Sequence, residues 1–155
     1  MVNRIVMDKK ILILLVTPLL VGCTPKEKVE ETQNVYVPEI THHNYFEVDD
    51  KTITWEKAFS IEKPDYFIYC YSPTCSHCAE IKDLMIEAAL SRNDLFFVKS
   101  SEKDKIVLDV SKSIGATTPE QIVILGYPTC IEIRKKILVE NKAGKTQIKK
   151  LLKLE

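Results

Sequence analysis

Apolar and polar residues recur along the chain with two periods, and these periods predict its elements. Residues 66–71 (Tyr-Phe-Ile-Tyr-Cys-Tyr) are six consecutive β-prone residues, which predicts a buried strand. Ser72-Pro73-Thr74 interrupts that strand, and beyond it apolar and acidic residues recur at helical spacing on opposite faces. The apolar face holds Cys78, Ile81, Met85 and Ala88, and the acidic face holds Glu80, Asp83 and Glu87. We therefore expect an amphipathic helix that runs to about residue 90.

The next apolar run, residues 95–98, predicts a second buried strand. A strand, a helix and a second strand form a βαβ unit, so the two strands are expected to be parallel. Upstream, residues 45–48 predict a short strand, and Thr54 is a candidate cap for a short helix that contains Trp55.

The second half of the chain predicts helices around a strand pair. Residues 103–114 carry Ile106, Val107, Val110 and Ile114 on one helical face, and residues 118–121 have the composition of a one-turn helix. Residues 129–134 and 136–140 alternate like two antiparallel strands, although Lys135-Lys136 between them is poor hairpin chemistry. The chain ends in a basic helix that contains Ile148, Leu151 and Leu152.

Cys75 and Cys78 form a C-x-x-C motif where the helix after the first strand is expected to begin. A helix N-terminus presents unpaired N–H groups and a partial positive charge, which favour the reactive thiolate. Cys78 lies one turn further on the same side, where it can attack a mixed disulfide on Cys75. The imidazolium form of His77 would stabilise the Cys75 thiolate further.

Two plainer interpretations of the motif are a structural disulfide and half of a zinc site. A four-ligand zinc site needs a second ligand pair at similar spacing. Cys70 and Cys130 instead stand alone inside apolar runs, where they are expected to be inert buried thiols, with a cross-strand disulfide or a third redox thiol as the alternatives. The interpretation that we favour is a redox-active Cys75–Cys78 pair without a metal or cofactor.

Residues 1–22 have the pattern of a bacterial lipoprotein signal peptide. A positive start, which contains Arg4, Lys9 and Lys10, precedes an apolar run of eleven residues, 11–21. Crossing a bilayer takes about 20 residues, so the run is too short for a membrane helix. It ends in Leu-Val-Gly-Cys23, which resembles the lipobox, in which the cysteine is diacylated and becomes the mature N-terminus.

We therefore expect a lipidated Cys23, a polar tether over residues 23–43 and a folded domain over residues 44–155. Acyl chains on Cys23 would hold the protein on the extracytoplasmic face of the cell membrane, where disulfides persist. An ordinary cleaved signal peptide with an incidental cysteine is the alternative. The histidine pair His42-His43 in the tether is interpreted as solvated.

Composition excludes some other classes of protein. With 45% apolar and 28% charged residues the chain suits one soluble domain with a normal core. Its formal net charge is zero and it has no basic, aromatic-rich patch, so nucleic acid is not an expected partner.

Gly126-Tyr127-Pro128-Thr129 is the second chemical landmark. A proline at the mouth of a β-run cannot donate to the sheet and often lies in a cis turn. With the C-x-x-C motif upstream, these two motifs and the predicted element order resemble the thioredoxin fold, an α/β fold whose central mixed sheet is flanked by helices. The resemblance covers residues 44–153.

The resemblance implies that Cys75 is the nucleophile and Cys78 the resolving cysteine. It also implies that Pro128 is the cis-proline that lies against them. Substrate would pair with the backbone of Tyr127 as an added strand, with Thr129 beside it.

The chain departs from the thioredoxins at several positions. Thr74 stands in place of their tryptophan, Ser76-His77 in place of Gly-Pro, and Tyr69 in place of their buried aspartate. A histidine before the second cysteine resembles the disulfide-forming DsbA-type proteins, but the 49 residues between Cys78 and Pro128 leave no room for their helical insertion.

The expected function is thiol–disulfide exchange with secreted or surface proteins, and an unidentified membrane redox partner is expected to exchange electrons with the cysteine pair. Whether the protein oxidises or reduces its clients does not follow from the sequence. The rival interpretation is a copper-handling lipoprotein that uses Cys75, Cys78 and His77 as soft ligands.

Overall fold

The structure, a computed structural model, describes residues 42–154. The predicted signal peptide over residues 1–22, the predicted lipidation site Cys23 and the predicted tether up to residue 41 lie outside the described residues. Among residues 42–154, no helix has the length and apolarity that crossing a membrane requires.

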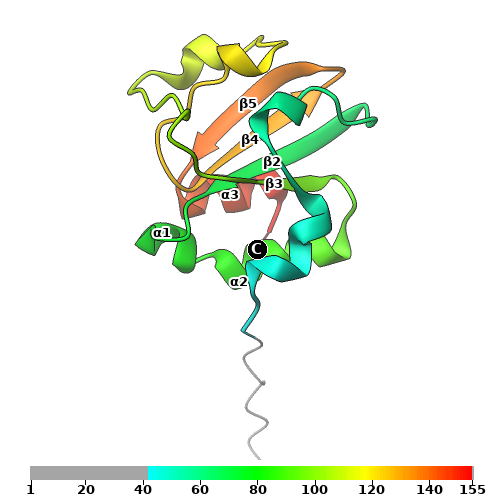
Figure 1. Cartoon of the computed structure of the whole chain (residues 1–155), viewed down its shortest axis with the longest axis vertical. Coiled ribbons are helices and arrows are strands. Elements are labelled where there is room, and N and C mark those ends of the chain that lie inside the picture. The colour runs from blue at the N-terminus through cyan, green and yellow to red at the C-terminus, as the bar shows by residue number, and fades with distance from the viewer. Residues whose placement is uncertain (1–41, 155) are drawn as a thin grey trace, which may run out of the picture. The chain divides into compact units, whose positions relative to one another are not determined.

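The core is a mixed sheet of five strands in the order β1-β3-β2-β4-β5 (Figure 1). Their bounds are β1 Thr52–Ile53, β2 Asp65–Tyr71, β3 Leu95–Lys99, β4 Thr129–Arg134 and β5 Ile137–Ala143. β2 is parallel to β3 and antiparallel to β4, and β4 pairs with β5 as an antiparallel hairpin. The predicted βαβ unit and the predicted strand pair are therefore both confirmed.

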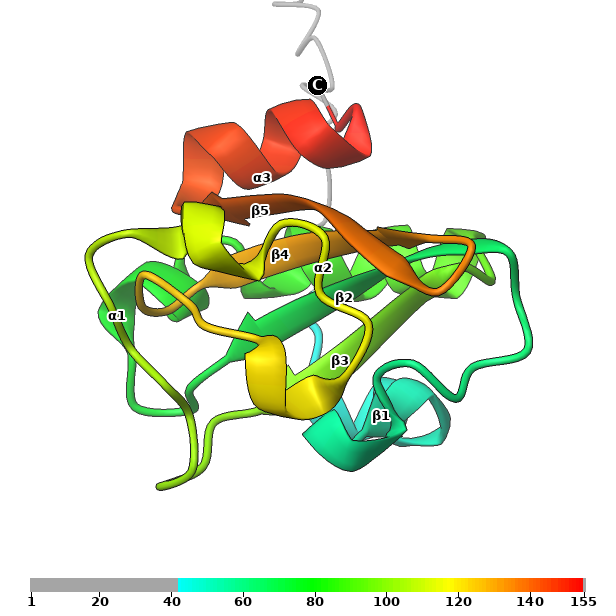
Figure 2. The ribbon, with the colours of Figure 1, turned by 90° about the horizontal axis from the view of Figure 1, so that it is seen from above.

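Helices and 3₁₀ turns cover the two faces of the sheet unequally. The helices are α1 Ser76–Ala79, α2 Lys82–Ser91 and α3 Lys145–Leu152, and the 3₁₀ turns are η1 Tyr45–Lys51, η2 Trp55–Lys57, η3 Val110–Ser113 and η4 Pro119–Gln121. Figure 1 shows α2 on one side of the sheet and the yellow turns of residues 110–121 on the other. Figure 2 shows α3 next to β5. The α-helices and η1 thus pack on one face, and η2, η3 and η4 cover the other.

The strand β2 divides the core because successive side chains of a strand point to opposite faces. Tyr66, Ile68 and Cys70 lie in the cluster on the side of η2, η3 and η4, whereas Tyr69 and Tyr71 lie in the cluster that η1, α2 and α3 cover. All five are buried, in agreement with the predicted buried strand.

The helix that follows the C-x-x-C motif is broken, which the sequence did not predict. Ile81 leaves helical geometry (φ −121°, ψ 5°) between α1 and α2. It is a β-branched residue with reduced helix propensity, and its side chain is buried in the core. The predicted apolar face survives the break, since Cys78, Met85 and Ala88 are buried as well.

The strand predicted over residues 45–48 is wrong, because this segment begins the turn η1. The side chain of Asn44 accepts a hydrogen bond from the Phe46 amide (3.4 Å), and the Glu47 carboxylate accepts one from the Asn44 amide (2.5 Å). This reciprocal cap starts a helical turn. The short edge strand β1 comes a few residues later and pairs with β3.

The helix predicted over residues 103–114 is also wrong. The amide of Val107 donates to the Ile124 carbonyl (2.9 Å), and the amide of Ile124 donates to the Lys105 carbonyl (2.9 Å), which makes an extended bridge. Further on, the Asp109 carboxylate accepts from the amide and the hydroxyl of Ser111. Side chains that bond the local backbone compete with a helix, so only the short turn η3 forms.

The predicted hairpin turns at Lys135 and Lys136, both with left-handed backbone (φ 50° and 64°). A two-residue turn of this hand matches the twist of the strands, although lysine is not a preferred residue there. The Lys135 amide donates to the Pro64 carbonyl and the Lys136 amine to the Ile61 carbonyl. The loop before β2 therefore holds the hairpin turn.

Arg92 fastens the turn between α2 and β3 to its surroundings. Its guanidinium holds the Asp94 carboxylate through two bonds of 2.5 and 2.8 Å, donates to the Leu152 carbonyl (3.4 Å) and lies over the Phe67 ring (4.9 Å).

We expect Arg92→Ala to lower the free energy of unfolding by about 1–3 kcal/mol. Lys142→Ala, which breaks the more exposed pair with Glu140, is the control and is expected to change it by less than about 0.5 kcal/mol.

The same pair predicts a pH dependence. Arg92 holds the pKa of Asp94 below its ordinary value. The contribution of the pair is therefore present above the unfolded-state pKa of about 3.9 and is lost as the pH falls through the lower folded-state pKa. Urea unfolding of wild type and Arg92→Ala at several pH values measures this, and a difference that grows on acidification would contradict it.

Candidate functional site

Cys75 lies at the N-cap of α1, immediately after the turn that ends β2. The amide of Cys75 donates to the Ser72 carbonyl (3.1 Å), and the Ala79 amide donates to the Cys75 carbonyl (3.1 Å). The predicted position of Cys75 at a helix mouth is therefore confirmed. Because α1 has only four residues, it brings only a short helix dipole to Cys75.

The two cysteines differ in their exposure. Cys75 is partly exposed, whereas Cys78 is only 1% exposed and lies in the core between α1 and the sheet. Burial is the main cause that raises the pKa of the Cys78 thiol well above its ordinary value, and the neighbouring Cys75 adds to the rise. The outer sulfur can therefore meet another protein, while the inner sulfur can reach only the outer one.

The loop before β4 lies against Cys75. The Tyr127–Pro128 bond is cis, as predicted, and the Cys75 thiol donates to the Tyr127 carbonyl at 3.4 Å. Pro128 and Thr129 are buried, and the Thr129 hydroxyl donates to the Gly126 carbonyl (2.6 Å). The structure thus brings Cys75, Cys78 and Pro128 together, while the substrate-binding role of Tyr127, Pro128 and Thr129 stays a prediction.

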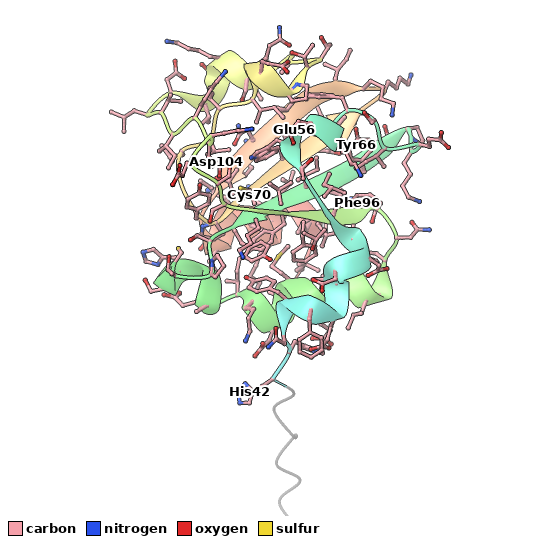
Figure 3. The ribbon with its side chains drawn as sticks, in the orientation of Figure 1. His42, Glu56, Tyr66, Cys70, Phe96 and Asp104 are labelled. Atoms are coloured by element: carbon pink, nitrogen blue, oxygen red, sulfur yellow. The ribbon has the colours of Figure 1, made fainter. Side chains whose placement is uncertain are left out.

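Asp104 holds this loop in place, and the sequence analysis missed it. Its carboxylate accepts hydrogen bonds from the Tyr127 hydroxyl (2.5 Å), the Trp55 indole (2.9 Å) and the hydroxyl and amide of Ser101 (2.9 and 3.1 Å). Ser101-x-x-Asp104 is a local turn signal, but the contacts with Trp55 and Tyr127 come from segments 49 and 23 residues away. Figure 3 labels Asp104 together with Cys70 of β2.

His77 lies on the outer side of α1. Its imidazole is 74% exposed and lies 3.4 Å from the Glu80 carboxylate. The effect of His77 on Cys75 stays a prediction. In the part of the chain that the structure describes, no three side chains of His, Cys, Asp or Glu converge as metal ligands.

His42 and His43, which were expected to be solvated in the tether, instead contact the folded domain. His43 is partly buried, and its imidazole lies 2.9 Å from the Glu47 carboxylate. Its amide donates to Asp83 of α2 (3.1 Å), and the exposed His42 imidazole lies 3.4 Å from the same carboxylate.

Cys70 and Cys130 are fully buried free thiols, as the plainer interpretation predicted. Cys70 lies in the cluster on the side of η2, η3 and η4, and Cys130 in the cluster that η1, α2 and α3 cover. Two cysteines on opposite faces of one sheet cannot form a disulfide without rebuilding a strand, so the alternative of a cross-strand bridge is wrong. Burial raises the pKa of both thiols, which keeps them unreactive.

Strand order, the C-x-x-C motif after β2 and the cis-proline before β4 define a thioredoxin fold. The predicted fold class is therefore confirmed. The helix that the sequence predicted between β3 and β4 is replaced in this chain by the extended segment near Ile106 and by η3 and η4.

Solved thioredoxins from several organisms are similar to this chain. Thioredoxin f2 of Chlamydomonas reinhardtii is 17% identical, with a TM-score of 0.42 over 66% of this chain and 90% of that one. The long form of thioredoxin f from spinach chloroplast is 16% identical, with a TM-score of 0.45 over 66% and 80% of the two chains. Plasmodium falciparum thioredoxin is 18% identical, with a TM-score of 0.43 over 66% and 96%. No protein-family model and no curated protein matches the chain.

The anchoring role of Asp104 predicts a measurable coupling. We expect Asp104→Asn to lower the free energy of unfolding by about 1–3 kcal/mol, because the partly buried donors of Trp55 and Tyr127 lose a charged acceptor. Tyr127→Phe removes one of these donors, so the double variant is expected to show a coupling energy of about 1 kcal/mol with Asp104→Asn. Glu102→Gln, an exposed neighbour on the same loop, serves as the control. Additive effects of the two substitutions would contradict the anchoring role.

Proposed function

We propose that this protein is a thiol–disulfide oxidoreductase that is anchored to the extracytoplasmic face of the cell membrane through a lipid on Cys23. It exchanges disulfides with secreted or surface proteins. The observation that carries the proposal is the partly exposed Cys75 thiol held 3.4 Å from the Tyr127 carbonyl, with cis-Pro128 beside it and Cys78 buried one turn behind.

In the reducing direction, the Cys75 thiolate attacks a client disulfide. A bond forms between Cys75 and one client sulfur, and the other client sulfur leaves as a thiolate that takes up a proton. Cys78 then attacks the sulfur of Cys75, which forms the Cys75–Cys78 disulfide and releases the second client thiol. The client gains two electrons, and the oxidising direction is the reverse of these steps.

The surroundings of Cys75 suit an extended client. The Tyr127 backbone precedes β4 beside the sulfur, where a client strand can add to it through main-chain hydrogen bonds. Leu125 (45% exposed) lies two residues away in the same loop and offers an apolar contact. A folded client would have less access to the Cys75 sulfur than an extended client, because Cys75 is only partly exposed.

The place of action is inferred from the sequence. The pattern over residues 1–23 supports lipidation, and disulfide chemistry is sustained outside the cytoplasm. A membrane redox partner would set the direction of electron flow, since a C-x-x-C pair can run either way. No observation favours the copper alternative, because Cys75, Cys78 and His77 do not converge as a ligand set among residues 42–154.

Cysteine substitutions test the exchange chemistry. Cys75→Ser is expected to abolish disulfide turnover, because the attacking sulfur is gone. Cys78→Ser is expected to accumulate mixed disulfides with clients, because the second step is blocked; non-reducing gels and mass spectrometry detect them. Cys130→Ala removes a buried thiol from the same side of the sheet and serves as the control with normal turnover. Full activity of Cys75→Ser would refute the assignment of the nucleophile.

Replacement of Cys23 tests the anchor. Wild-type protein is expected in the membrane fraction with an acylated N-terminal Cys23, whereas Cys23→Ser is expected to leave that fraction. Mass spectrometry of the N-terminal peptide provides the direct readout. An unmodified Cys23 in membrane-bound protein would overturn this part of the proposal and leave the exchange chemistry in place.

A further inference from the structure

The inner cysteine, Cys78, packs against a cluster of aromatic rings. Tyr69 of β2 is fully buried, with its ring edge-on to Phe97 (5.5 Å, 74°) and parallel to Tyr71 (6.1 Å, 7°). Tyr71 in turn stacks on Tyr45 of η1 (3.8 Å, 18°). These contacts fix the rings and leave little freedom for the hydroxyl of Tyr69 to point elsewhere.

Two hydroxyls of this cluster, those of Tyr45 and Tyr69, are buried without a hydrogen-bond partner among the described residues. Buried tyrosine hydroxyls nearly always find a partner, as Tyr66 does by donating to the Ala58 carbonyl at 2.6 Å. The hydroxyls of Tyr69 and Tyr45 are buried with no partner of normal geometry among the described residues. Both tyrosines and Cys78 lie in one core cluster, and there Tyr45 and Tyr69 each alter the pKa of the other while Tyr69 alters the pKa of Cys78.

We propose that the Tyr69 hydroxyl donates a hydrogen bond to the Cys78 sulfur when that sulfur becomes a thiolate, and that Tyr45 is a positioning residue that donates to the oxygen of Tyr69. A thiol is a weak acceptor, whereas a thiolate is a strong one, so the bond belongs to the reacting state. The otherwise unused hydroxyls then gain partners during exchange. This inference rests on the proposed function, because it concerns the step in which Cys78 acts.

The step balances without a further reactant. In the mixed disulfide Cys75 is bonded to a client sulfur, and the Cys78 thiol gives its proton to solvent. The thiolate attacks Cys75, the Cys75–Cys78 bond forms, and the bond from Cys75 to the client breaks. The client sulfur leaves with the electron pair and takes up a proton, so the client is reduced and the cysteine pair is oxidised.

Burial opposes this step, and Tyr69 offsets part of the cost. Desolvation raises the pKa of Cys78, whereas the Tyr69 hydroxyl and the backbone at Ser72 lower it. Burial also raises the pKa of Tyr69 itself, so its hydroxyl remains a donor throughout the neutral range. The titratable groups that interact with Cys78 come from four segments and are thiols or phenols: Cys75 of the α1 N-cap, Tyr69 and Cys70 of β2, Tyr45 of η1 and Tyr127 before β4.

Three tyrosine-to-phenylalanine variants separate the hydroxyl from the ring. Tyr69→Phe and Tyr45→Phe remove the proposed donors, and Tyr66→Phe is the matched control, because Tyr66 is buried in the same strand but faces the other cluster. In protein that carries Cys23→Ser, Cys75 is converted to a mixed disulfide with 5-thio-2-nitrobenzoate. The release of this coloured thiolate then reports the attack by Cys78 alone, and stopped-flow absorbance follows it from pH 6 to 9.

Tyr69→Phe is expected to slow the release about threefold at each pH below the pKa of Cys78, because about tenfold less thiolate is present while the more basic thiolate is about threefold more nucleophilic. Tyr45→Phe is expected to slow it less, and Tyr66→Phe to leave it unchanged. In a Cys75→Ser background, the Cβ resonance of ¹³C-labelled Cys78 is expected to titrate about one pH unit higher in Tyr69→Phe than in the parent. A merely structural role of Tyr69 would not move this titration.

Release at the wild-type rate in Tyr69→Phe, or an unchanged Cys78 titration, would overturn the inference. Circular dichroism checks that each variant is folded, and if Tyr69→Phe does not fold, Tyr45→Phe decides by the same readouts. Failure of the proposed function has a different signature. In that case the wild-type mixed disulfide releases its thiolate with the predicted dependence on Tyr69, but no protein disulfide is turned over.

Discussion

The pairing of β2 with β4 is the constraint on which the site depends. Cys70 lies opposite Thr129 in this antiparallel pair, so the last residues of β2 and the first residues of β4 lie side by side at the same end of the sheet. The turn after β2 carries Cys75, and the loop before β4 carries Pro128. The Cys75 sulfur therefore reaches the carbonyl of Tyr127, although 52 positions separate the two residues. A slip of one residue would move Tyr69 to the opposite face and take it away from Cys78.

Motifs that act locally made much of the fold predictable. The β-prone run of residues 66–71, the C-x-x-C motif and the alternation in residues 129–134 each specify their element through neighbouring residues alone. Residues 103–114 show the limit of this approach, because their apolar residues do recur at helical spacing. Their backbone instead pairs with Ile124, which is distant in sequence, and the side chain of Asp109 bonds the chain locally. The cap between Asn44 and Glu47 was readable in the sequence, but the β-prone residues between them favoured a strand.

The candidate site was predictable in its reactive groups and not in its support. Cys75, Cys78 and Pro128 follow from two motifs and their order. The carboxylate of Asp104 is recognisable as an anchor only after folding brings Trp55 and Tyr127 to it. The difference in burial between Cys75 and Cys78 likewise depends on the packing of α1 against the sheet. Sequence spacing placed both sulfurs on one side of a helix, but the break at Ile81 shortens that helix to four residues.

The most direct test of the central claim is equilibration of the purified protein with thiol–disulfide redox buffers, followed by mapping of the disulfide-linked peptides. We predict one reversible two-electron transition that joins Cys75 to Cys78. Its potential is expected between about −270 and −120 mV, the range that thioredoxin and DsbA span. Cys70 and Cys130 are expected to remain free thiols on both sides of the transition. A Cys75–Cys78 pair that cannot be oxidised and reduced reversibly, or a bridge that involves Cys70 or Cys130 in the folded protein, would contradict the account.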